Sequence, residues 1–288
     1  MKIINKLQGG KVNISFEVFP PKTDERYYSV KNAVSDIATL NPSFISVTYG
    51  ASGGTSKNTT KIASHIKNEL GIDSLAHLTC TSSTKEEVSA VIDELNAARI
   101  ENVLALRGDK PEGFELTTED SYQYAKDLVK LLRSKGDFCI GAACYPEGHV
   151  ENEHKIDDIR YLKEKVDAGV DFLTTQMIFD NTVLYNFLYR IREQGITVPV
   201  LPGIMPVTNG KQIKRICALS GATLPQRFRA IVDCFGDEPK AMMQAGIAYA
   251  TDQIIDLIAN DIKNIHVYSM NKPEVATGIM RNLSEIVG

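Results

Sequence analysis

The sequence predicts an α/β fold, a closed (β/α)8 barrel that spans the chain, and three observations lead to this fold class. Short apolar runs, bounded by Gly, Pro or Asp, recur about eight times along the 288 residues. Segments with the periodicity of amphipathic helices separate these runs. Several runs also end abruptly in Arg, Asp, Glu or His, which is typical of barrel strands that carry an active site at their C-terminal tips.

The eight predicted strands lie, in chain order, at about 13–19, 44–49, 75–80, 102–107, 138–145, 171–178, 197–204 and 264–269. Eight is the number of parallel strands that closes a barrel of the TIM type. The alternative is an open doubly wound sheet, whose first strand is followed by a Gly-x-Gly-x-x-Gly turn. Here Pro20-Pro21 follows Phe19 and excludes such a turn, so the sequence favours the barrel.

Helical periodicity fills the intervals between the strands. One face carries Val88, Val91, Ile92 and Leu95 in the segment 84–98, and Tyr124, Leu128, Leu131 and Leu132 in the segment 121–133. The long interval 205–263 predicts three extra helices, near 209–219, 225–233 and 237–260, and a further helix at about 272–286 closes the chain. No linker, low-complexity segment or short repeat interrupts the pattern, so residues 1–288 are expected to form a single domain.

Composition and charge exclude several classes of function. The net charge is −4, with 32 basic and 36 acidic residues and no basic cluster, which argues against nucleic acid as a partner. No segment resembles a signal peptide or is apolar enough to span a bilayer, so a cytoplasmic protein without a membrane partner is expected. The five cysteines form no Cys-x-x-Cys pair, and the five histidines show no metal-ligand spacing, which favours buried free thiols and no metal site.

Glu17 is the first candidate for chemistry, because it lies inside an apolar strand. Strand alternation puts Phe16 and Val18 on one face and Glu17 on the other, toward either the barrel lumen or the helices. A lumen carboxylate in a low dielectric is expected to have a raised pKa, which suits a general acid near neutral pH. A salt-bridged structural glutamate is the alternative, and the strand pattern leaves both open.

Polar residues at other strand tips form more of the candidate site. Arg107 and Asp109 flank Gly108, which permits an unusual backbone turn, and their position directly after a buried strand distinguishes them from a surface turn. His77 lies within the third strand, where a hydrogen-bonded core role competes with catalysis. Gln176 is an uncharged amide among apolar neighbours, and it either reads the edge of a heterocycle or bonds to backbone.

The fifth strand leads into a further group of polar residues. Tyr145 and His149 follow this strand directly. In the next helix, at 156–168, the spacing of seven residues puts Asp158 and Lys165 on one face, two turns apart. Solvent exposure is the expected state of both side chains.

Taken together, these segments resemble methylenetetrahydrofolate reductase of the compact bacterial type. Nine segments carry the resemblance, and they run in order over nearly the whole chain. They are Ser-Phe-Glu-Val-Phe-Pro-Pro (15–21), Ser-Val-Thr-Tyr-Gly (46–50), His-Leu-Thr-Cys (77–80), Ala-Leu-Arg-Gly-Asp (105–109), Tyr-Pro-Glu-x-His (145–149), Lys-Val-Asp-Ala-Gly (165–169), Thr-Gln (175–176), Pro-Gly-Ile-Met-Pro-Val (202–207) and His-Val-Tyr-Ser-Met-Asn (266–271). Each segment is weak by itself, but nine in order are highly specific.

The resemblance implies a flavoenzyme of one-carbon metabolism and methionine biosynthesis. In this family a nicotinamide reduces FAD at the C-terminal ends of the strands, and the reduced flavin passes hydride to 5,10-methylenetetrahydrofolate, giving 5-methyltetrahydrofolate. The resemblance makes Glu17 the general acid that opens the folate ring and Asp109 the carboxylate that stabilises the iminium cation, while Gln176 orients the substrate. The residues that it assigns to FAD are Thr48, His77, Arg107, Asp109, Tyr145, His149, Asp158, Lys165 and Tyr268.

Two positions depart from the family pattern. The helix after Pro206 offers Ile213 and Ile216 where an aromatic residue is common, and the predicted substrate-binding Lys272 stands where an arginine is common. Without an aromatic residue, the nicotinamide or folate would stack less well, which favours a protein electron donor over NADH. NADH, NADPH and a protein donor are all kept as alternatives. The alternative functions are a flavin-carrying subunit of a multi-protein reductase and another FAD barrel of the proline dehydrogenase type. The resemblance also implies homo-oligomers.

Overall fold

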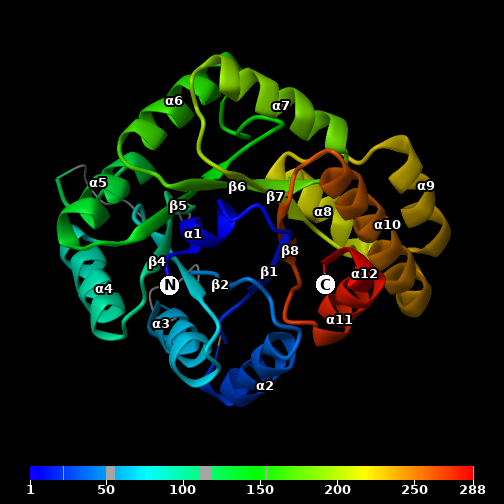
Figure 1. Ribbon diagram of the computed structural model, residues 1–288, viewed down its shortest axis with the longest axis horizontal. Helices are drawn as coiled ribbons and strands as arrows, with labels where there is room; N and C mark the ends of the chain where they lie inside the picture. The colour runs from blue at the N-terminus through cyan, green and yellow to red at the C-terminus, as the bar shows by residue number, and fades with distance from the viewer. Residues whose placement is uncertain (22, 50–55, 110–118, 153–154, 288) are drawn as a thin grey trace.

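The computed structural model describes residues 1–21, 23–49, 56–109, 119–152 and 155–287. Within these ranges eight parallel strands close into a barrel in chain order, with β8 paired to β1 (Figure 1). The strands are β1 (Asn13–Val18), β2 (Ile45–Val47), β3 (Ser74–Thr79), β4 (Asn102–Leu106), β5 (Cys139–Cys144), β6 (Phe172–Ile178), β7 (Val200–Ile204) and β8 (Asn264–Tyr268). The predicted fold class is confirmed.

Helices connect consecutive strands and form a ring outside the barrel, whereas α1 lies over its middle (Figure 1). They are α1 (Ile3–Leu7), η1 (Asp24–Arg26), α2 (Tyr27–Ala38), α3 (Ser56–Ser64), the π-helical η2 (His65–Glu69), α4 (Lys85–Ala97), α5 (Ala125–Lys135), α6 (Lys155–Asp167), α7 (Asn181–Glu193), α8 (Gly210–Ser220), α9 (Gln226–Phe235), α10 (Pro239–Ala259), α11 (Pro273–Asn282) and α12 (Ser284–Val287). The three extra helices predicted before the last strand are α8, α9 and α10, and the predicted C-terminal helix divides into α11 and α12. In the described ranges, no helix combines the length and the apolar character that crossing a membrane requires.

Local sequence signals explain several helix bounds. Thr84 and Glu87 form a capping box at the start of α4, which satisfies backbone N–H groups that a helix leaves unpaired. Asn209 caps α8, and Gly221 ends it with a left-handed φ of 72°. The prediction for Tyr124 is wrong: this residue precedes α5 in an extended conformation and is 61% exposed, so it is not part of the apolar helix face.

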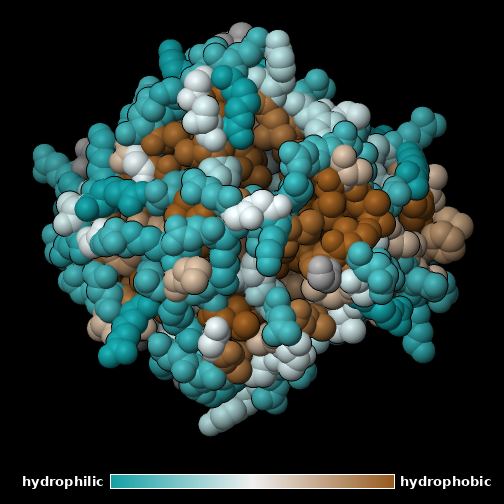
Figure 2. Space-filling view, in the orientation of Figure 1, coloured by the Kyte–Doolittle hydropathy of each residue, from teal (hydrophilic) through white to brown (hydrophobic). Residues whose placement is uncertain are grey.

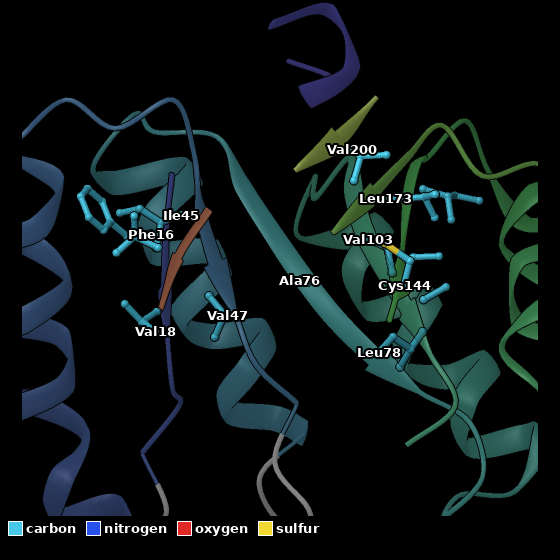
Figure 3. Close-up of a cluster of buried hydrophobic side chains, with 14 of the residues drawn as sticks. Phe16, Val18, Ile45, Val47, Ala76, Leu78, Val103, Cys144, Leu173 and Val200 are labelled. Carbon is cyan, nitrogen blue, oxygen red and sulfur yellow. The ribbon is translucent and has the colours of Figure 1, made fainter. Parts of the chain in front are cut away.

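The main hydrophobic core lies between the strands and the surrounding helices. Phe16 and Leu173, on opposite sides of the barrel, each direct their side chains toward neighbouring helices (Figure 3). Phe16 and Val18 are fully buried in this core, and alternation therefore points Glu17 into the lumen. The structure thus decides between the two directions that the sequence leaves open.

A second apolar layer closes the N-terminal end of the barrel. Ile3 and Leu7 of α1 pack there against a layer of side chains from the strand ends. The buried members of that layer are Phe44, Leu75, Leu104, Cys139, Phe172 and Leu201. Because α1 plugs this end, the lumen opens at the other end, where the strands point.

The extra helices build a satellite cluster beside β7 and β8. Within it the Phe228 ring stacks on both Phe179 and Tyr249. The ring centroids are 5.4 Å apart for Phe179 and Phe228 and 4.2 Å apart for Phe228 and Tyr249. In the space-filling view, apolar surface gathers over the region where Figure 1 shows α8 and α10 (Figure 2). Ser220 and Ala222, at the end of α8, line a small pocket together with Tyr145 and Gln176, which places that end of α8 near the strand tips.

The cysteines largely follow the expectation from the sequence. Cys80, Cys139 and Cys144 are buried free thiols in the strand region. Cys217 is half-buried, and Cys234 is exposed on α9, so the expectation of burial is wrong for Cys234. Burial raises the pKa of the Cys144 thiol to about 12, which keeps it protonated and unreactive at neutral pH.

Candidate active site

The open end of the barrel leads into a cavity of about 1010 Å³. Every predicted site residue except Lys272 lines this cavity. They are Glu17, Thr48, His77, Arg107, Asp109, Tyr145, His149, Asp158, Lys165, Gln176 and Tyr268. Residues far apart in the sequence meet here because the C-terminal ends of parallel strands converge at one face of the barrel.

Glu17 lies at the inner end of the cavity, where it is 8% exposed. Its Oε2 atom is 3.4 Å from Nε2 of His77 on β3 and 3.5 Å from Nε2 of His266 on β8. The same oxygen accepts a hydrogen bond of 3.4 Å from the Ser46 hydroxyl on β2. The pairing of β1 with β2 and β8 sets Glu17 level with Ser46 and Tyr268, so this carboxylate is enclosed by side chains of adjacent strands.

The electrostatics of Glu17 correct one prediction. Burial raises the pKa of this carboxyl, but the imidazole groups of His266 and His77 and the Ser46 hydroxyl together hold the pKa below its ordinary value of 4.5. The expected raised pKa is therefore wrong for the protein alone. Strand periodicity revealed the apolar burial of Glu17 but not its two imidazole neighbours, which come from strands distant in the sequence.

His77 carries an unsatisfied polar atom beside Glu17. Its Nε2 atom is buried and has no hydrogen-bond partner within the described part of the chain. Burial lowers the pKa of His77 to about 4, against the attraction of Glu17, so the ring is neutral at pH 7. The nearest carboxylate oxygen, Oε2 of Glu17, lies 3.4 Å away, so this nitrogen keeps the capacity for a hydrogen bond to a ligand in the cavity.

Lys165 places a cation at the side of the cavity. This residue and Asp158 on α6 are half-buried, so the prediction that they are solvent-exposed is wrong. The Lys165 ammonium donates a hydrogen bond of 2.5 Å to the Ala143 carbonyl on β5. Burial lowers the pKa of Lys165 to about 8, although Cys144 and Asp158 oppose the shift. Its charge is thus poorly compensated in the free protein.

Asp158 organises the loop that follows β5. Its carboxylate accepts a hydrogen bond of 2.8 Å from the His149 backbone N–H and another from the Asn152 side-chain amide. The His149 ring packs edge-on against Tyr145, with centroids 4.6 Å apart. The carboxylate thereby holds two predicted ligand-binding side chains at the cavity wall.

A second cation, Arg107, sits at the tip of β4. It donates two hydrogen bonds, of 2.6 Å and 2.7 Å, to the carboxylate of Glu151. Gly108 follows with a φ of +85°, and a Cβ there would lie 2.8 Å from Cβ of Thr79. The turn that brings Asp109 to the cavity therefore requires glycine on two counts.

A strand irregularity shapes the cavity wall at β6 and β7. The pairing of β6 with β7 shifts register between Thr174 and Met177, and such bulges re-aim side chains next to active sites. Gln176 lies in this shift, lines the cavity, and accepts a hydrogen bond of 3.0 Å from the Met177 N–H. Tyr268 donates a hydrogen bond of 2.7 Å to the Thr175 carbonyl, and burial raises its pKa well above 10.

Lys272 stands apart from the other predicted residues. Its ammonium group donates a hydrogen bond of 2.6 Å to the Thr208 hydroxyl, and the residue does not line the cavity. The sequence did not point to Ser46 and His266, which contact Glu17, or to Ser15, which contacts His266. A signal for His266 was present, since it lies two residues before Tyr268 and so on the same strand face.

The fold and this cavity define a (β/α)8 barrel with a large cavity at the C-terminal face of its strands, and comparisons with known proteins specify the family. The family model for methylenetetrahydrofolate reductase matches residues 2–284, so the chain belongs to the methylenetetrahydrofolate reductase family. The 5,10-methylenetetrahydrofolate reductase of Escherichia coli (strain K12) is 35% identical over 274 residues, which cover 95% of this chain and 91% of that protein.

Longer relatives and one solved structure extend the comparison. Methylenetetrahydrofolate reductase (NADH) 1 of Zea mays is 36% identical over 303 residues, covering 99% of this chain but 51% of that protein. The chain thus spans about half the length of the plant relatives it matches. An uncharacterized protein from Clostridium thermocellum that binds two copies of 5-methyl-5,6,7,8-tetrahydrofolic acid shares the fold, with a TM-score of 0.70 at 14% identity and 98% coverage of both chains.

Proposed function

We propose that this chain reduces 5,10-methylenetetrahydrofolate to 5-methyltetrahydrofolate with FAD as its cofactor, and that residues 1–288 act as one catalytic domain. The observation that carries the proposal is a carboxylate, Glu17, buried at the inner end of the strand-tip cavity in a member of this family. The folate bound by the fold relative from Clostridium thermocellum agrees with a folate substrate.

The residues of the cavity fit FAD on chemical grounds. Lys165, whose charge is poorly compensated in the free protein, suits the anionic pyrophosphate, and Arg107 can exchange its carboxylate partner for phosphate. Nε2 of His77 lacks a partner among the described residues and offers a hydrogen bond to the ligand. FAD, when bound, supplies the hydride that the folate accepts, after taking it from the electron donor.

The chain's own residues would then provide proton transfer and charge stabilisation. Before it can accept hydride, the folate ring has to open to an iminium cation, and a proton donor assists that opening. In the proposed reaction Glu17 donates this proton from its buried position. Asp109 at the tip of β4 supplies negative charge toward the cation, and Gln176 orients the substrate by hydrogen bonds.

The electron donor follows less directly from the site. Ile213 is fully buried in the satellite cluster, and Ile216 packs against that cluster. Both residues are aliphatic, so neither provides a ring on which a nicotinamide could stack. This arrangement favours a second candidate, in which the chain is the flavin-carrying subunit of a reductase complex and receives electrons from a partner protein. NADH, NADPH and a reduced protein remain the three classes of donor to test.

Steady-state turnover tests the proposal. The purified chain, reconstituted with FAD, is mixed with methylenetetrahydrofolate and either NADH, NADPH or a reduced viologen dye, and 5-methyltetrahydrofolate is quantified by mass spectrometry. Product with a nicotinamide supports the single-chain reductase, whereas product only with the dye supports the subunit. FAD-loaded protein that forms no product with any donor overturns the folate assignment.

A further inference from the structure

We propose that His266, acting through the Ser46 hydroxyl, shares one proton with Glu17 and is the positioning residue that sets how much of Glu17 is in its proton-donating form. The inference deepens the proposed function and rests on it, because it concerns the same general acid. Its basis is a continuous chain of hydrogen-bonding groups that runs across β1, β2 and β8 behind the cavity.

The chain of groups starts at the backbone and ends at the carboxylate. The Ser15 hydroxyl lies 3.0 Å from the Ile265 carbonyl and 2.8 Å from Nδ1 of His266. At the other side of the ring, Nε2 of His266 lies 3.1 Å from the Ser46 hydroxyl. That hydroxyl is in turn 3.4 Å from Oε2 of Glu17. The imidazole therefore bridges two hydroxyls, and one of them reaches the acid.

The donor and acceptor roles along this chain admit two arrangements. The Ile265 carbonyl accepts only, so the Ser15 proton points to it and Ser15 accepts from Nδ1–H of His266. With Glu17 protonated, its O–H donates to Ser46 and the Ser46 O–H donates to the bare Nε2 of His266. With Glu17 ionised, both ring nitrogens carry protons, Nε2–H donates to Ser46, and Ser46 donates to the carboxylate. The two arrangements contain the same number of protons and differ in whether one of them lies on Glu17 or on Nε2 of His266.

His266 is placed to act on Glu17 and on nothing in the cavity. The residue is 1% exposed, it does not line the cavity, and its ring stacks on Phe44 at 5.6 Å with an interplanar angle of 15°. Glu17 does line the cavity and so stands between His266 and any ligand. A role for His266 in the reaction therefore passes through Glu17, which its Nε2 atom reaches by way of the Ser46 hydroxyl and also approaches directly at 3.5 Å.

The other titratable groups that face this pair, His77 and Tyr268, do not change their protonation state near neutral pH. His77 on β3 has a pKa lowered to about 4 by burial, so it is neutral. Tyr268 on β8 contacts the His266 ring edge-on, and burial raises its pKa well above 10, so it is neutral too. Among the described residues around the carboxylate, Glu17 and His266 are left as the two sites for the proton.

The shared proton matters because each folate reduced takes up one proton besides the hydride. In the proposed reaction this proton leaves Oε2 of Glu17 and forms the N–H bond of the opened folate ring. The carboxylate that remains faces Ser46 and His266, and a proton from solvent restores the pair. His266 stabilises the ionised form of Glu17, so its removal makes Glu17 hold its proton to higher pH.

Infrared spectroscopy tests the sharing without any folate. The C=O stretching band of a protonated carboxyl is followed against pH in the FAD-loaded protein, and subtracting the same protein with Glu17→Gln isolates the Glu17 band. In His266→Gln, the pH at which this band disappears should rise by about one pH unit or more, a tenfold change in proton affinity. Ser46→Ala should move it in the same direction, and Ser46→Thr, which keeps the hydroxyl, should restore it.

A buried imidazole elsewhere provides the matched control. His65 is buried in η2, remote from β1, and His65→Gln should leave the Glu17 band unchanged. If His266→Gln moves the band no more than His65→Gln does, the sharing is overturned. A band that shifts in a protein without folate activity would instead sink the proposed function and leave the Glu17–His266 pair standing.

Single-turnover kinetics supply the second measurement. In the oxidation of the reduced flavin by methylenetetrahydrofolate, the rate should fall as the pH rises and Glu17 loses its proton. His266→Gln should move this fall to higher pH by about one unit and leave chemical reduction of the flavin unchanged. A rate that drops equally at every pH, with the fall in its original place, would show a purely structural role for His266.

Discussion

The two ends of the barrel differ in what their buried polar groups face: other protein groups at the N-terminal end, and the cavity at the C-terminal end. At the N-terminal end, the Asn13 amide donates a hydrogen bond of 2.8 Å to the Asn264 side chain, and the Asn102 side chain binds the backbone of Ile3 and Ser74. At the C-terminal end, Nε2 of His77 has no partner in the described part of the chain. Each end thus contains an unpaired buried atom among the described residues, Oγ of Ser74 at the closed end and Nε2 of His77 at the open end, but of these two residues only His77 lines the cavity.

Charge follows the same division. At the closed end, Asp73 makes ion pairs of 2.8 Å with Lys6 and 2.9 Å with Lys67. At the open end, Lys165 donates to a backbone carbonyl and has a pKa lowered to about 8 by burial. The difference teaches that the strand ends near α1 stabilise the fold, whereas the opposite ends retain polar groups that a ligand would complete.

The largest effect that distinguishes the two ends is expected at Glu17. Glu17→Gln keeps the size of the side chain but removes the proton that the folate ring needs, so folate reduction should fall by about 10³-fold or more. Flavin reduction by a competent donor should be retained, as should FAD binding. Stopped-flow absorbance of the two half-reactions measures both. Equal losses in the two half-reactions would show that Glu17 has a structural role, like the buried residues at the closed end of the barrel.

A core substitution at the closed end should show the opposite pattern. Phe172 is fully buried in the layer beneath α1, and Phe172→Ala should lower the free energy of unfolding by about 4 kcal/mol through lost burial and a cavity. The affinity for FAD, measured by flavin fluorescence titration in the folded protein, should stay close to that of the wild type. The matched control is Phe235→Ala, because Phe235 is 40% exposed and its loss should cost little.

Lys165 should separate stability from binding. In Lys165→Met, FAD affinity should fall by about 100-fold, because a charge-assisted contact to phosphate is lost. The free energy of unfolding of the protein without FAD should instead rise by about 2 kcal/mol at pH 7, because a partly desolvated ammonium is replaced by an apolar chain. Chemical denaturation and flavin titration measure the two effects. Lys163→Met is the control, because Lys163 makes a surface ion pair with Asp167 and should change neither quantity much.

The pH dependence of Lys165 has a defined sign. Its pKa of about 8 in the folded protein is below the ordinary value of 10.5, so charging the folded protein is unfavourable below pH 8. The stability advantage of Lys165→Met should therefore be full below pH 8 and shrink as the pH rises from about 8 to 10.5. FAD binding by the wild type should weaken over the same rise, because the anion prefers the charged lysine. A wild-type affinity that is constant from pH 7 to pH 10 would count against the phosphate role.

The smallest effect is expected at Asp73. Burial raises the pKa of this carboxyl, but Lys6 and Lys67 outweigh it, and the pKa falls from 3.8 to about 2. Asp73 therefore contributes stability that is present above pH 4 and is lost as the pH falls toward 2. Asp73→Asn should cost about 1 kcal/mol at pH 7 and progressively less on acidification, as denaturation curves at several pH values will show. A cost that does not change with pH would exclude the ion pairs as its cause.

The sequence predicted the barrel well because strand runs and helix periodicity are local signals. The strands and the three helices before β8 follow from such runs, and the convergence of strand tips explains why the predicted residues at those tips meet at the cavity, while their roles stay predictions. Helix α1 was missed since five residues are too few for a periodic pattern, and its role as a plug depends on contacts with distant strands. The exposed Tyr124 was misplaced because an aromatic at helical spacing is no guide to where the helix begins.

The electrostatics of the site were the hardest part to predict. The strand pattern placed Glu17 in an apolar run and so suggested a raised pKa, but the pKa depends on His77 and His266, which arrive from β3 and β8. The half-burial of Lys165 similarly depends on how α6 packs against β5. The spacing of seven residues between Asp158 and Lys165 places them on one helix face but does not show what that face contacts. Pairwise distances between elements decide protonation, and a single sequence does not contain them.

Folate reduction at the open end of the barrel can be tested in one anaerobic experiment. The FAD-loaded protein is reduced chemically in the absence of oxygen and mixed with methylenetetrahydrofolate while the flavin absorbance is recorded. We expect the oxidised flavin spectrum to return with stoichiometric formation of 5-methyltetrahydrofolate. A bound flavin that stays reduced in the presence of the folate would contradict it.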